Sequence, residues 1–205
     1  MSLKTLVKIN HVSNLSDARY CAGMGVEMLG FEFNTASTHY VTPQKMKEIS
    51  GWLSGVKIVA EINNLKPENF IETFEEIHFD YIQVQNILLK NIKDLNYPII
   101  YKIEWNEENT FGKFDAYFND FKNYVSYFLI SSEIEKIKPE DLKEINLISE
   151  KYNVLLNFNL SGEDFNHILL ETKIKGIAIN GNTEIKLGYT NTDSIADILE
   201  TIEEE

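Results

Sequence analysis

Short apolar runs alternate with longer amphipathic segments along the whole chain, and this alternation limits the possible folds more than any other feature. The runs are rich in β-branched and aromatic residues. Several begin with nearly continuous apolar stretches, which is typical of strands buried on both faces of a parallel sheet. We predict eight strands, over residues 6–10, 28–33, 57–62, 81–85, 99–105, 127–132, 154–160 and 176–180.

Helix-start signals lie between these runs. A proline is favourable in a first helical turn because its missing N–H has no helical partner to lose there. A serine followed three positions later by an acidic residue is typical of a capping box. The signals are Thr42-Pro43, Lys66-Pro67-Glu68, Lys138-Pro139-Glu140-Asp141, Ser161-Gly162-Glu163-Asp164 and Asp193. The aromatic-rich segment 106–123 is predicted to be a short or distorted helix.

Eight strand–helix units in 205 residues amount to roughly 25 residues per unit, which fits a small (β/α)8 barrel. We therefore predict an α/β protein with a closed (β/α)8 TIM barrel. A single domain is expected over residues 1–205, with an acidic tail at about 203–205. The alternative is a doubly wound open sheet. Its dinucleotide-binding form is disfavoured, because no glycine-rich turn follows the first predicted strand.

The chain carries 32 acidic and 19 basic residues, which gives a formal net charge of −13. This balance repels a phosphate backbone and an anionic membrane surface, so we expect neither nucleic-acid nor membrane partners. A small phosphorylated ligand is still compatible, because local backbone N–H groups can outweigh the overall field. With one cysteine, no apolar run of membrane-span length and no signal peptide pattern, we expect a cytoplasmic monomer or homodimer.

The first fifty residues carry a pattern known from one enzyme family. It comprises Val7-Lys8-Ile9, Asn14-Leu15-Ser16-Asp17-Ala18, Gly25, Leu29-Gly30-Phe31, Phe33 and Tyr40-Val41-Thr42-Pro43. It continues through Gln83 and returns at Leu160, Glu163, Glu184, Gly188 and Asp193-Ser194-Ile195. In these residues the chain resembles phosphoribosylanthranilate isomerase, a small (β/α)8 barrel enzyme of tryptophan biosynthesis. The resemblance implies an Amadori rearrangement of an aminoaldose phosphate to an aminoketose phosphate.

The resemblance also implies which positions perform catalysis, and the chain departs from the family at both. The family's base is a cysteine in a Lys-Ile-Cys-Gly motif, which here reads Lys8-Ile9-Asn10-His11. Its acid is an aspartate at the end of strand six, where this chain has Ser131 as the first choice and Ile130 as the second. An asparagine amide cannot act as a general base at neutral pH, and serine needs a partner to donate a proton. We therefore expect little or no isomerase activity.

The phosphate-binding positions implied by the resemblance differ as well. The family has glycines after strand seven and a Ser-Ser-Gly turn after strand eight, where this chain has Phe158-Asn159 and Asn180-Gly181-Asn182. The second turn can still form a nest of N–H groups, because Gly and Asn tolerate positive φ. The family's arginine in the second loop is replaced by His39. We expect a polar ligand or a loosely held anion, bound by His39, Gln83, Asn157, Asn159, Asn180, Gly181 and Asn182.

Two sets of side chains are candidate replacements for the lost catalytic groups. His11 is a candidate base, because the unperturbed pKa of a histidine side chain is near neutrality. We favour a loop histidine that points away, because strand alternation gives the inward direction to Asn10. Lys102 and Glu104 lie two residues apart and share a face of their strand. They suit an acid–base or ligand-binding pair and a structural salt bridge equally well.

Further polar residues lie near the carboxyl ends of predicted strands, where barrel active sites form. Glu32 and Glu61 could together bind a divalent cation or a cationic ligand. We favour the interpretation that each pairs with a nearby lysine or faces the helices. Gln83 and Gln85 share a face and suit either ligand binding or interior packing, whereas Cys21 suits a small core residue. We predict no metal and no cofactor.

The function that these residues predict is that of a divergent isomerase-like barrel. It would act on or bind a different small polar or phosphorylated molecule, or have a non-catalytic role. The alternative is a genuine phosphoribosylanthranilate isomerase, an intramolecular aldose–ketose isomerase, with a rewired acid–base pair.

Overall fold

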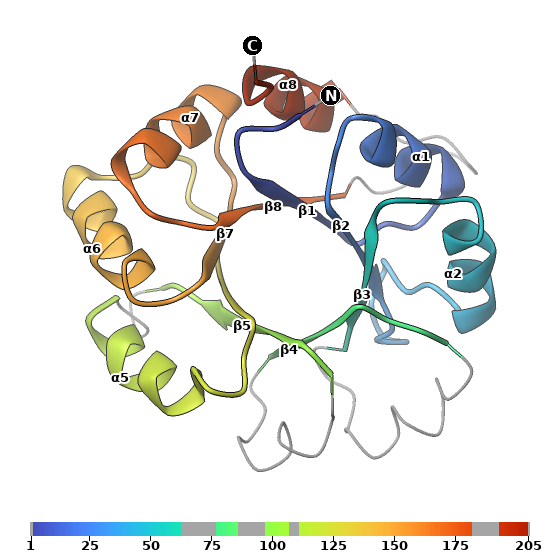
Figure 1. Ribbon diagram of the computed structural model, residues 1–205, viewed down its shortest axis with the longest axis horizontal. Coiled ribbons are helices and arrows are strands. Elements are labelled where there is room, and N and C mark those ends of the chain that lie inside the picture. Colours follow the sequence, from blue (N-terminus) through green and yellow to red (C-terminus); the bar gives the residue numbers. More distant parts are fainter. Residues whose placement is uncertain (1, 63–76, 86–96, 107–110, 182–192, 205) are drawn as a thin grey trace.

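A computed structural model describes residues 2–62, 77–85, 97–106, 111–181 and 193–204. Eight parallel strands close a barrel in the order β1 to β8, and β8 pairs back onto β1. The described helices form a ring outside the barrel (Figure 1). The predicted (β/α)8 barrel is confirmed, and the open-sheet alternative is wrong.

Each predicted strand is present. The bounds are β1 (Leu6–Asn10), β2 (Met28–Glu32), β3 (Lys57–Glu61), β4 (Tyr81–Gln85), β5 (Ile99–Glu104), β6 (Tyr127–Ser132), β7 (Val154–Phe158) and β8 (Gly176–Asn180). Four strands end one or two residues before the predicted bound. For β2, β3 and β7 the reason is that burial continues past the end of the strand, since Phe33, Ile62 and Leu160 are all buried; Trp105, which follows β5, is partly buried.

The described helices are α1 (Leu15–Gly23), α2 (Pro43–Ser50), α5 (Phe111–Phe121), α6 (Pro139–Ser149), α7 (Gly162–Glu171) and α8 (Asp193–Thr201). Their predicted start signals work as expected. The Thr42 side chain accepts the backbone N–H of Lys45, and Ser161 and Asp164 form a capping box. The predicted aromatic segment contains the 11-residue helix α5. The helix predicted to begin at Lys66-Pro67-Glu68 lies outside the described residues.

The hydrophobic core has two parts, as in other barrels of this kind. The larger part lies between the strands and the helices and includes Cys21, which is fully buried. Burial raises the pKa of the Cys21 thiol to about 12, which makes it an inert core residue as predicted. A smaller cluster fills the interior of the barrel with Met28, Val59, Ile100, Leu129, Leu155 and Ala178.

The two ends of the described chain lie close together (Figure 1). Leu3 and Glu203 form an antiparallel bridge, and the backbone N–H of Glu204 donates to the Ser2 carbonyl oxygen over 3.0 Å. Among the residues that the structure describes, no helix is long and apolar enough to cross a membrane.

Candidate active site

Polar side chains occupy the inward positions toward the carboxyl end of the barrel. Every second residue of a strand points inward. The inward polar set is Lys8, Asn10, Glu32, Glu61, Gln83, Gln85, Lys102, Glu104, Ser131, Asn157 and Asn180. Most of these residues are buried. Because buried polar groups are costly without partners, their hydrogen bonds determine which of them can act on a ligand.

An ion pair between Lys8 and Glu61 lies at the centre of this set. Lys8 Nζ donates to Glu61 Oε1 over 2.5 Å and also to Asn10 Oδ1. Both charged side chains are 0% exposed. Gly30 leaves the space for the pair, because a Cβ on that residue would lie 2.0 Å from Glu61 Oε1. The strand β2 therefore needs a glycine at this position.

The surroundings favour the charged form of Glu61. Burial alone would raise the pKa of Glu61, but the Lys8 ammonium and, after it, the neighbouring His11 outweigh burial and hold that pKa well below its usual value. Burial lowers the pKa of Lys8, and the Glu61 carboxylate opposes that shift. Glu61 is therefore an ionised carboxylate at neutral pH.

A chain of amide groups leads from this pair to strands β7 and β8. Asn10 Nδ2 donates to Asn180 Oδ1 over 2.8 Å. Asn157 Nδ2 donates to the Ala178 carbonyl oxygen over 2.9 Å and to Asn180 Oδ1 over 3.2 Å. Ser131 Oγ donates to Asn157 Oδ1 over 3.1 Å. The two positions that carry the isomerase base and acid by resemblance, Asn10 and Ser131, therefore belong to one internal network.

The turn after β8 forms a hydrogen bond with strand β1 of the same chain. The backbone N–H of Gly181 donates to the Asn10 carbonyl oxygen over 2.8 Å. A Cβ on Gly181 would lie 2.6 Å from that same oxygen, so the two backbones approach too closely for a side chain. Asn182, the third residue of the predicted nest, lies outside the described residues. The Gly181 N–H is thus committed to strand β1.

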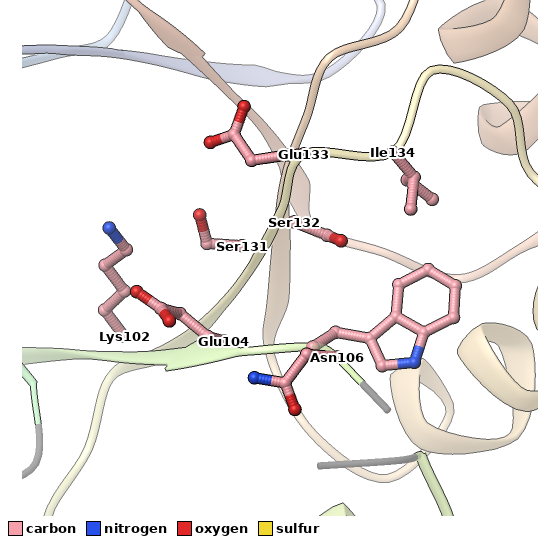
Figure 2. Close-up of a pocket in the computed structure, with 8 residues that line it drawn as sticks. Lys102, Glu104, Asn106, Ser131, Ser132, Glu133 and Ile134 are labelled. Carbon is pink, nitrogen blue, oxygen red and sulfur yellow. The ribbon is translucent and has the colours of Figure 1, made fainter. Parts of the chain in front are cut away.

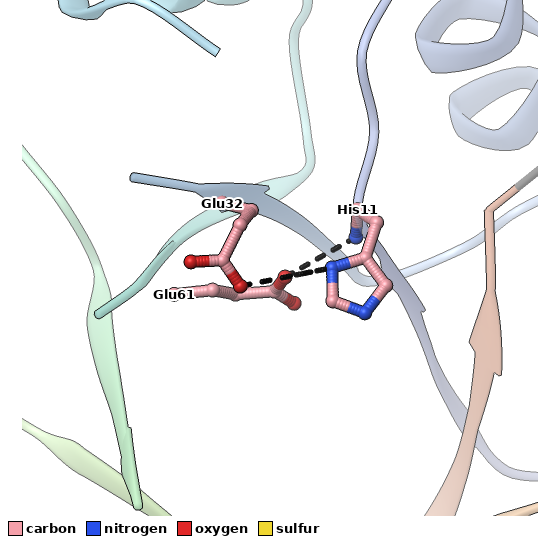
Figure 3. A group of neighbouring side chains, drawn as sticks. All are labelled: His11, Glu32 and Glu61. Carbon is pink, nitrogen blue, oxygen red and sulfur yellow. Dashed lines mark hydrogen bonds and ion pairs between the residues drawn. The ribbon is translucent and has the colours of Figure 1, made fainter. Parts of the chain in front are cut away.

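His11 points into the site, and our prediction that it points away is wrong. Its φ of 58° is in the left-handed region, so strand alternation ends at Asn10. Its backbone N–H donates to Glu61 Oε2 over 3.2 Å. Its Nδ1 lies 2.9 Å from Glu61 Oε2 and 4.0 Å from Glu32 Oε2 (Figure 3).

His39 lies next to His11. The two rings stack with centroids 4.9 Å apart and an interplanar angle of 21°. Burial lowers the pKa of His39, and the neighbouring His11 lowers it further. The position that carries an arginine in the family therefore favours a neutral imidazole here, which is a weak attractor for an anionic ligand.

The two glutamates at the strand ends both face the barrel interior. Glu61 does pair with a lysine, as the favoured interpretation held. Glu32 faces the barrel interior and not the helices, and its Oε1 accepts the backbone N–H of Asn34 over 2.8 Å. His11, Glu32 and Glu61 each offer one ligand atom, and these atoms lie within 4.8 Å of one another. They are the residues in the described part of the chain that could hold a metal ion.

A cavity of about 700 Å³ opens between the ends of β5 and β6; we call it the β5–β6 cavity. Its lining consists of Lys102, Glu104, Trp105, Asn106, Ser131, Ser132, Glu133 and Ile134. Figure 2 shows Lys102 and Glu104 projecting from β5 on the side that faces Ser131 and Glu133. Glu104 Oε1 accepts a hydrogen bond from Gln85 Nε2 over 3.0 Å. The predicted Lys102–Glu104 pair therefore borders a volume large enough for a small ligand.

A second cavity of about 670 Å³ lies over the ends of β7 and β8; we call it the β7–β8 cavity. Phe158, Asn159, Asn180, Gly181 and Ser194 contribute to its lining, so it occupies the region where the family resemblance places phosphate. Three carboxylates also line it, from Glu133, Glu163 and Asp197. Among the described lining residues there is no lysine or arginine to balance them.

Lys8 was not among the site residues predicted from the sequence. The signal was present, because Lys8 is a charged residue inside an apolar strand and lies two positions before Asn10. It therefore had to face the barrel interior with Asn10. Its partner Glu61 follows 53 residues later, so the pair itself was not visible from local spacing.

Comparison with solved structures identifies similar barrels. Phosphoribosyl anthranilate isomerase from Thermotoga maritima aligns with a TM-score of 0.81 and 18% identity over 97% of this chain and 98% of that one. A phosphoribosyl anthranilate isomerase in complex with reduced 1-(o-carboxyphenylamino)-1-deoxyribulose 5-phosphate aligns with a TM-score of 0.79 and 18% identity, over 97% and 98% of the chains. The phosphoribosyl anthranilate isomerase from Thermus thermophilus aligns with a TM-score of 0.77 and 17% identity, over 96% of this chain and 97% of that one.

These similarities extend over nearly the whole length of each chain, and at this level of identity they establish the fold. No family model matches the sequence, and no curated protein matches it.

Proposed function

We propose that this chain is a phosphoribosylanthranilate isomerase-like barrel with little or no isomerase activity, which binds a different small polar ligand. The β5–β6 cavity at the carboxyl end of the barrel would hold that ligand. The proposal rests mainly on the hydrogen bonds of the Asn10 side chain. Its Oδ1 accepts from Lys8 and its Nδ2 donates to Asn180, so the side chain at the base position is committed to the protein.

The acid position supports the same conclusion. Ser131 Oγ donates its proton to Asn157 Oδ1, and no charged residue is in that contact. A serine hydroxyl in such a bond is a poor general acid at neutral pH, because its pKa lies far above the operating pH. The neighbouring Lys102 and Glu104 supply both signs of charge on the border of the cavity. A polar ligand with its own charged or hydrogen-bonding groups suits that lining.

The phosphate region also argues against the family substrate. The Gly181 N–H is used by the Asn10 carbonyl oxygen, and carboxylates of Glu133, Glu163 and Asp197 line the β7–β8 cavity. A phosphate placed there would meet like charges, and the Gly181 N–H would have to leave the Asn10 carbonyl oxygen to bind it. We therefore expect weak affinity for ligands that carry a ribose phosphate.

Calorimetric titration with the reduced 5-phosphate analogue named above tests this proposal. We expect no saturable binding below about 1 mM, an affinity equivalent to about 4 kcal/mol. The variant Glu133→Lys should raise the affinity for this anion, because it reverses one charge of the lining. Glu135→Lys is the matched control, since it makes the same change two residues away on an exposed side chain outside both cavity linings. Micromolar binding by the unmodified protein would contradict the proposal.

A second candidate function is a rewired isomerase, and one observation favours it. His11 directly follows the base position and points into the site, with its Nδ1 2.9 Å from an oxygen of the ionised Glu61. His11 Nε2 would then be the base that takes the substrate proton. Under this candidate the purified protein turns over phosphoribosylanthranilate, and His11→Asn abolishes the turnover.

A further inference from the structure

The three side chains shown in Figure 3 come from three adjacent strand ends and converge on one point. His11 follows β1, Glu32 ends β2 and Glu61 ends β3. Glu32 and Glu61 are register partners, so their carboxylates leave neighbouring strands on the same inward side. Glu61 is 0% and Glu32 4% exposed, whereas the His11 side chain is 20% exposed, so the cluster is buried at the glutamates and reached by solvent at the histidine.

We propose that His11, Glu32, Glu61 and Gln83 form a binding site for one divalent transition-metal ion. The ligand atoms would be the Nδ1 of His11, one oxygen from each glutamate and the Oε1 of Gln83. This site is separate from the β5–β6 cavity, and the proposal holds whether or not the barrel catalyses isomerisation.

Two carboxylates, Glu32 and Glu61, are buried on neighbouring strands here, and the buried ammonium of Lys8 contacts Glu61. Buried carboxylates favour positively charged neighbours, because burial penalises their own charge. A protonated His11 or a bound cation would both suit a position between the two carboxylates.

The hydrogen-bond geometry favours the cation. His11 Nδ1 lies close to Glu61 Oε2, yet it makes no hydrogen bond with acceptable geometry to any residue in the described part of the chain. A proton on Nδ1 therefore lies off the line to that oxygen. A metal ion does not need this alignment, because it sits between the ligand atoms and not on the line that joins two of them.

Gln83 provides an independent observation. It is the register partner of Glu61 on β4, so its side chain faces the same interior beside that carboxylate. It is 1% exposed, and within the described residues its Oε1 has no hydrogen-bond partner. A buried carbonyl oxygen without a donor is rare in folded proteins and calls for a missing partner. A cation next to Glu61 would be that partner.

The donor set indicates the kind of metal. One imidazole nitrogen with carboxylate and amide oxygens suits Zn²⁺ or Mn²⁺ better than Ca²⁺, which prefers oxygen ligands alone. An ion held at about 2.0–2.2 Å from each ligand needs ligand atoms roughly 3–4 Å apart. The separations of up to 4.8 Å among the ligand atoms of His11, Glu32 and Glu61 therefore require these side chains to close by up to about 1–2 Å.

The contact between Lys8 and Glu61 leaves one oxygen of the Glu61 carboxylate available to a metal ion. Lys8 contacts Glu61 Oε1, whereas His11 approaches Glu61 Oε2. The carboxylate can thus bridge the ammonium and the metal with different oxygens. His39 stacks on the His11 ring and supports its orientation.

The test begins with the full chain, freed of metal by a chelator and then titrated with Zn²⁺ and Mn²⁺ by calorimetry. We expect one ion per chain, with a Kd in the micromolar range or below for at least one of the two ions. Co²⁺ serves as the spectroscopic probe. Its visible absorption is weak in water and becomes stronger when an imidazole and carboxylates coordinate the ion. Absence of 1:1 binding of any of the three ions would overturn the proposal.

Two variants separate this site from accidental surface binding. Glu32→Gln retains an oxygen for the Asn34 N–H but removes the charged ligand, and should weaken binding at least about tenfold. His11→Asn removes the imidazole and keeps a residue that tolerates positive φ, so it should abolish the Co²⁺ band. Glu104→Gln is the matched control, a carboxylate at the end of β5 outside the cluster, and should bind the ion as the unmodified chain does. Equal affinities in Glu32→Gln, Glu104→Gln and the unmodified chain would overturn the proposal, and circular dichroism checks that each variant is folded.

Discussion

Replacing Glu61 by glutamine tests the energetic role of the buried ion pair. The change keeps the shape of the side chain but leaves the ammonium of Lys8 without a charged partner in a position where both residues are 0% exposed. Removing one member of a buried pair typically costs about 3–5 kcal/mol. Deprotonation of Lys8 limits the cost, because burial already lowers its pKa. We therefore expect a loss of about 3 kcal/mol in the free energy of unfolding.

Urea denaturation followed by circular dichroism measures this loss. The midpoint should fall while the slope with urea concentration stays unchanged, since the folded structure buries the same surface. A loss of about 3 kcal/mol corresponds to a decrease in Tm of roughly 6–12 °C for a domain of this size. Glu104→Gln is the control: Glu104 is exposed and accepts one hydrogen bond from Gln85, so it should cost less than about 1 kcal/mol. A cost below about 1 kcal/mol for Glu61→Gln would refute the reasoning.

The same variant should change the pH dependence of stability. The pKa of Glu61 in the folded protein is lowered from an ordinary value of 4.5. A carboxyl group of this kind stabilises the fold fully above its unfolded pKa, and the contribution decreases as pH falls below about 4.5 toward the folded pKa. The unmodified protein should therefore lose this part of its stability in acid, and Glu61→Gln should show a flatter profile over that range.

Three further predictions follow from particular contacts. Gly30→Ala should lower the free energy of unfolding by about 1–3 kcal/mol or more in a denaturant titration. Its Cβ would lie 2.0 Å from Glu61 Oε1 and 2.7 Å from Lys8 Nζ. An unchanged free energy of unfolding would show that the ion pair moves aside easily. Asn10→Cys should not produce isomerase activity in a fluorescence assay, because Ser131 stays at the acid position. The same variant should lower the free energy of unfolding by about 1–3 kcal/mol, because Lys8 and Asn180 each lose a hydrogen-bond partner. Ser161→Ala should cost about 1 kcal/mol by removing the capping box of α7, and a change in Tm below the error of the measurement would contradict that assignment.

Most of the barrel could be predicted from the sequence because its signals are local. Apolar runs and helix-start signals are properties of a few neighbouring residues. They located all eight strands and, among the described helices, α2, α5, α6, α7 and α8. Strand ends were less accurate where an apolar residue such as Phe33 stays buried just beyond the last paired position. Burial and strand pairing are different properties, and a hydrophobicity pattern reports only the first.

The candidate site was predicted less well, because its geometry depends on long-range contacts and on one unusual backbone conformation. The inward direction of Asn10 and the carboxyl-end location of Glu61 follow from alternation and topology. The pairing of Lys8 with Glu61 joins residues on strands β1 and β3 and needs the glycine at position 30 between them. The orientation of His11 depends on its positive φ, which no pattern in the sequence indicated.

The turnover of phosphoribosylanthranilate by the purified protein tests the central claim most directly. Loss of the anthranilate fluorescence reports the isomerisation, and general acid and base groups each contribute about 10²–10⁴-fold to such a reaction. With Asn10 and Ser131 at the two positions, we predict a rate indistinguishable from the background without protein. A turnover number of about 1 s⁻¹ or more, in the ordinary range of enzymes, would contradict the account and make His11 the first candidate for the replacement base.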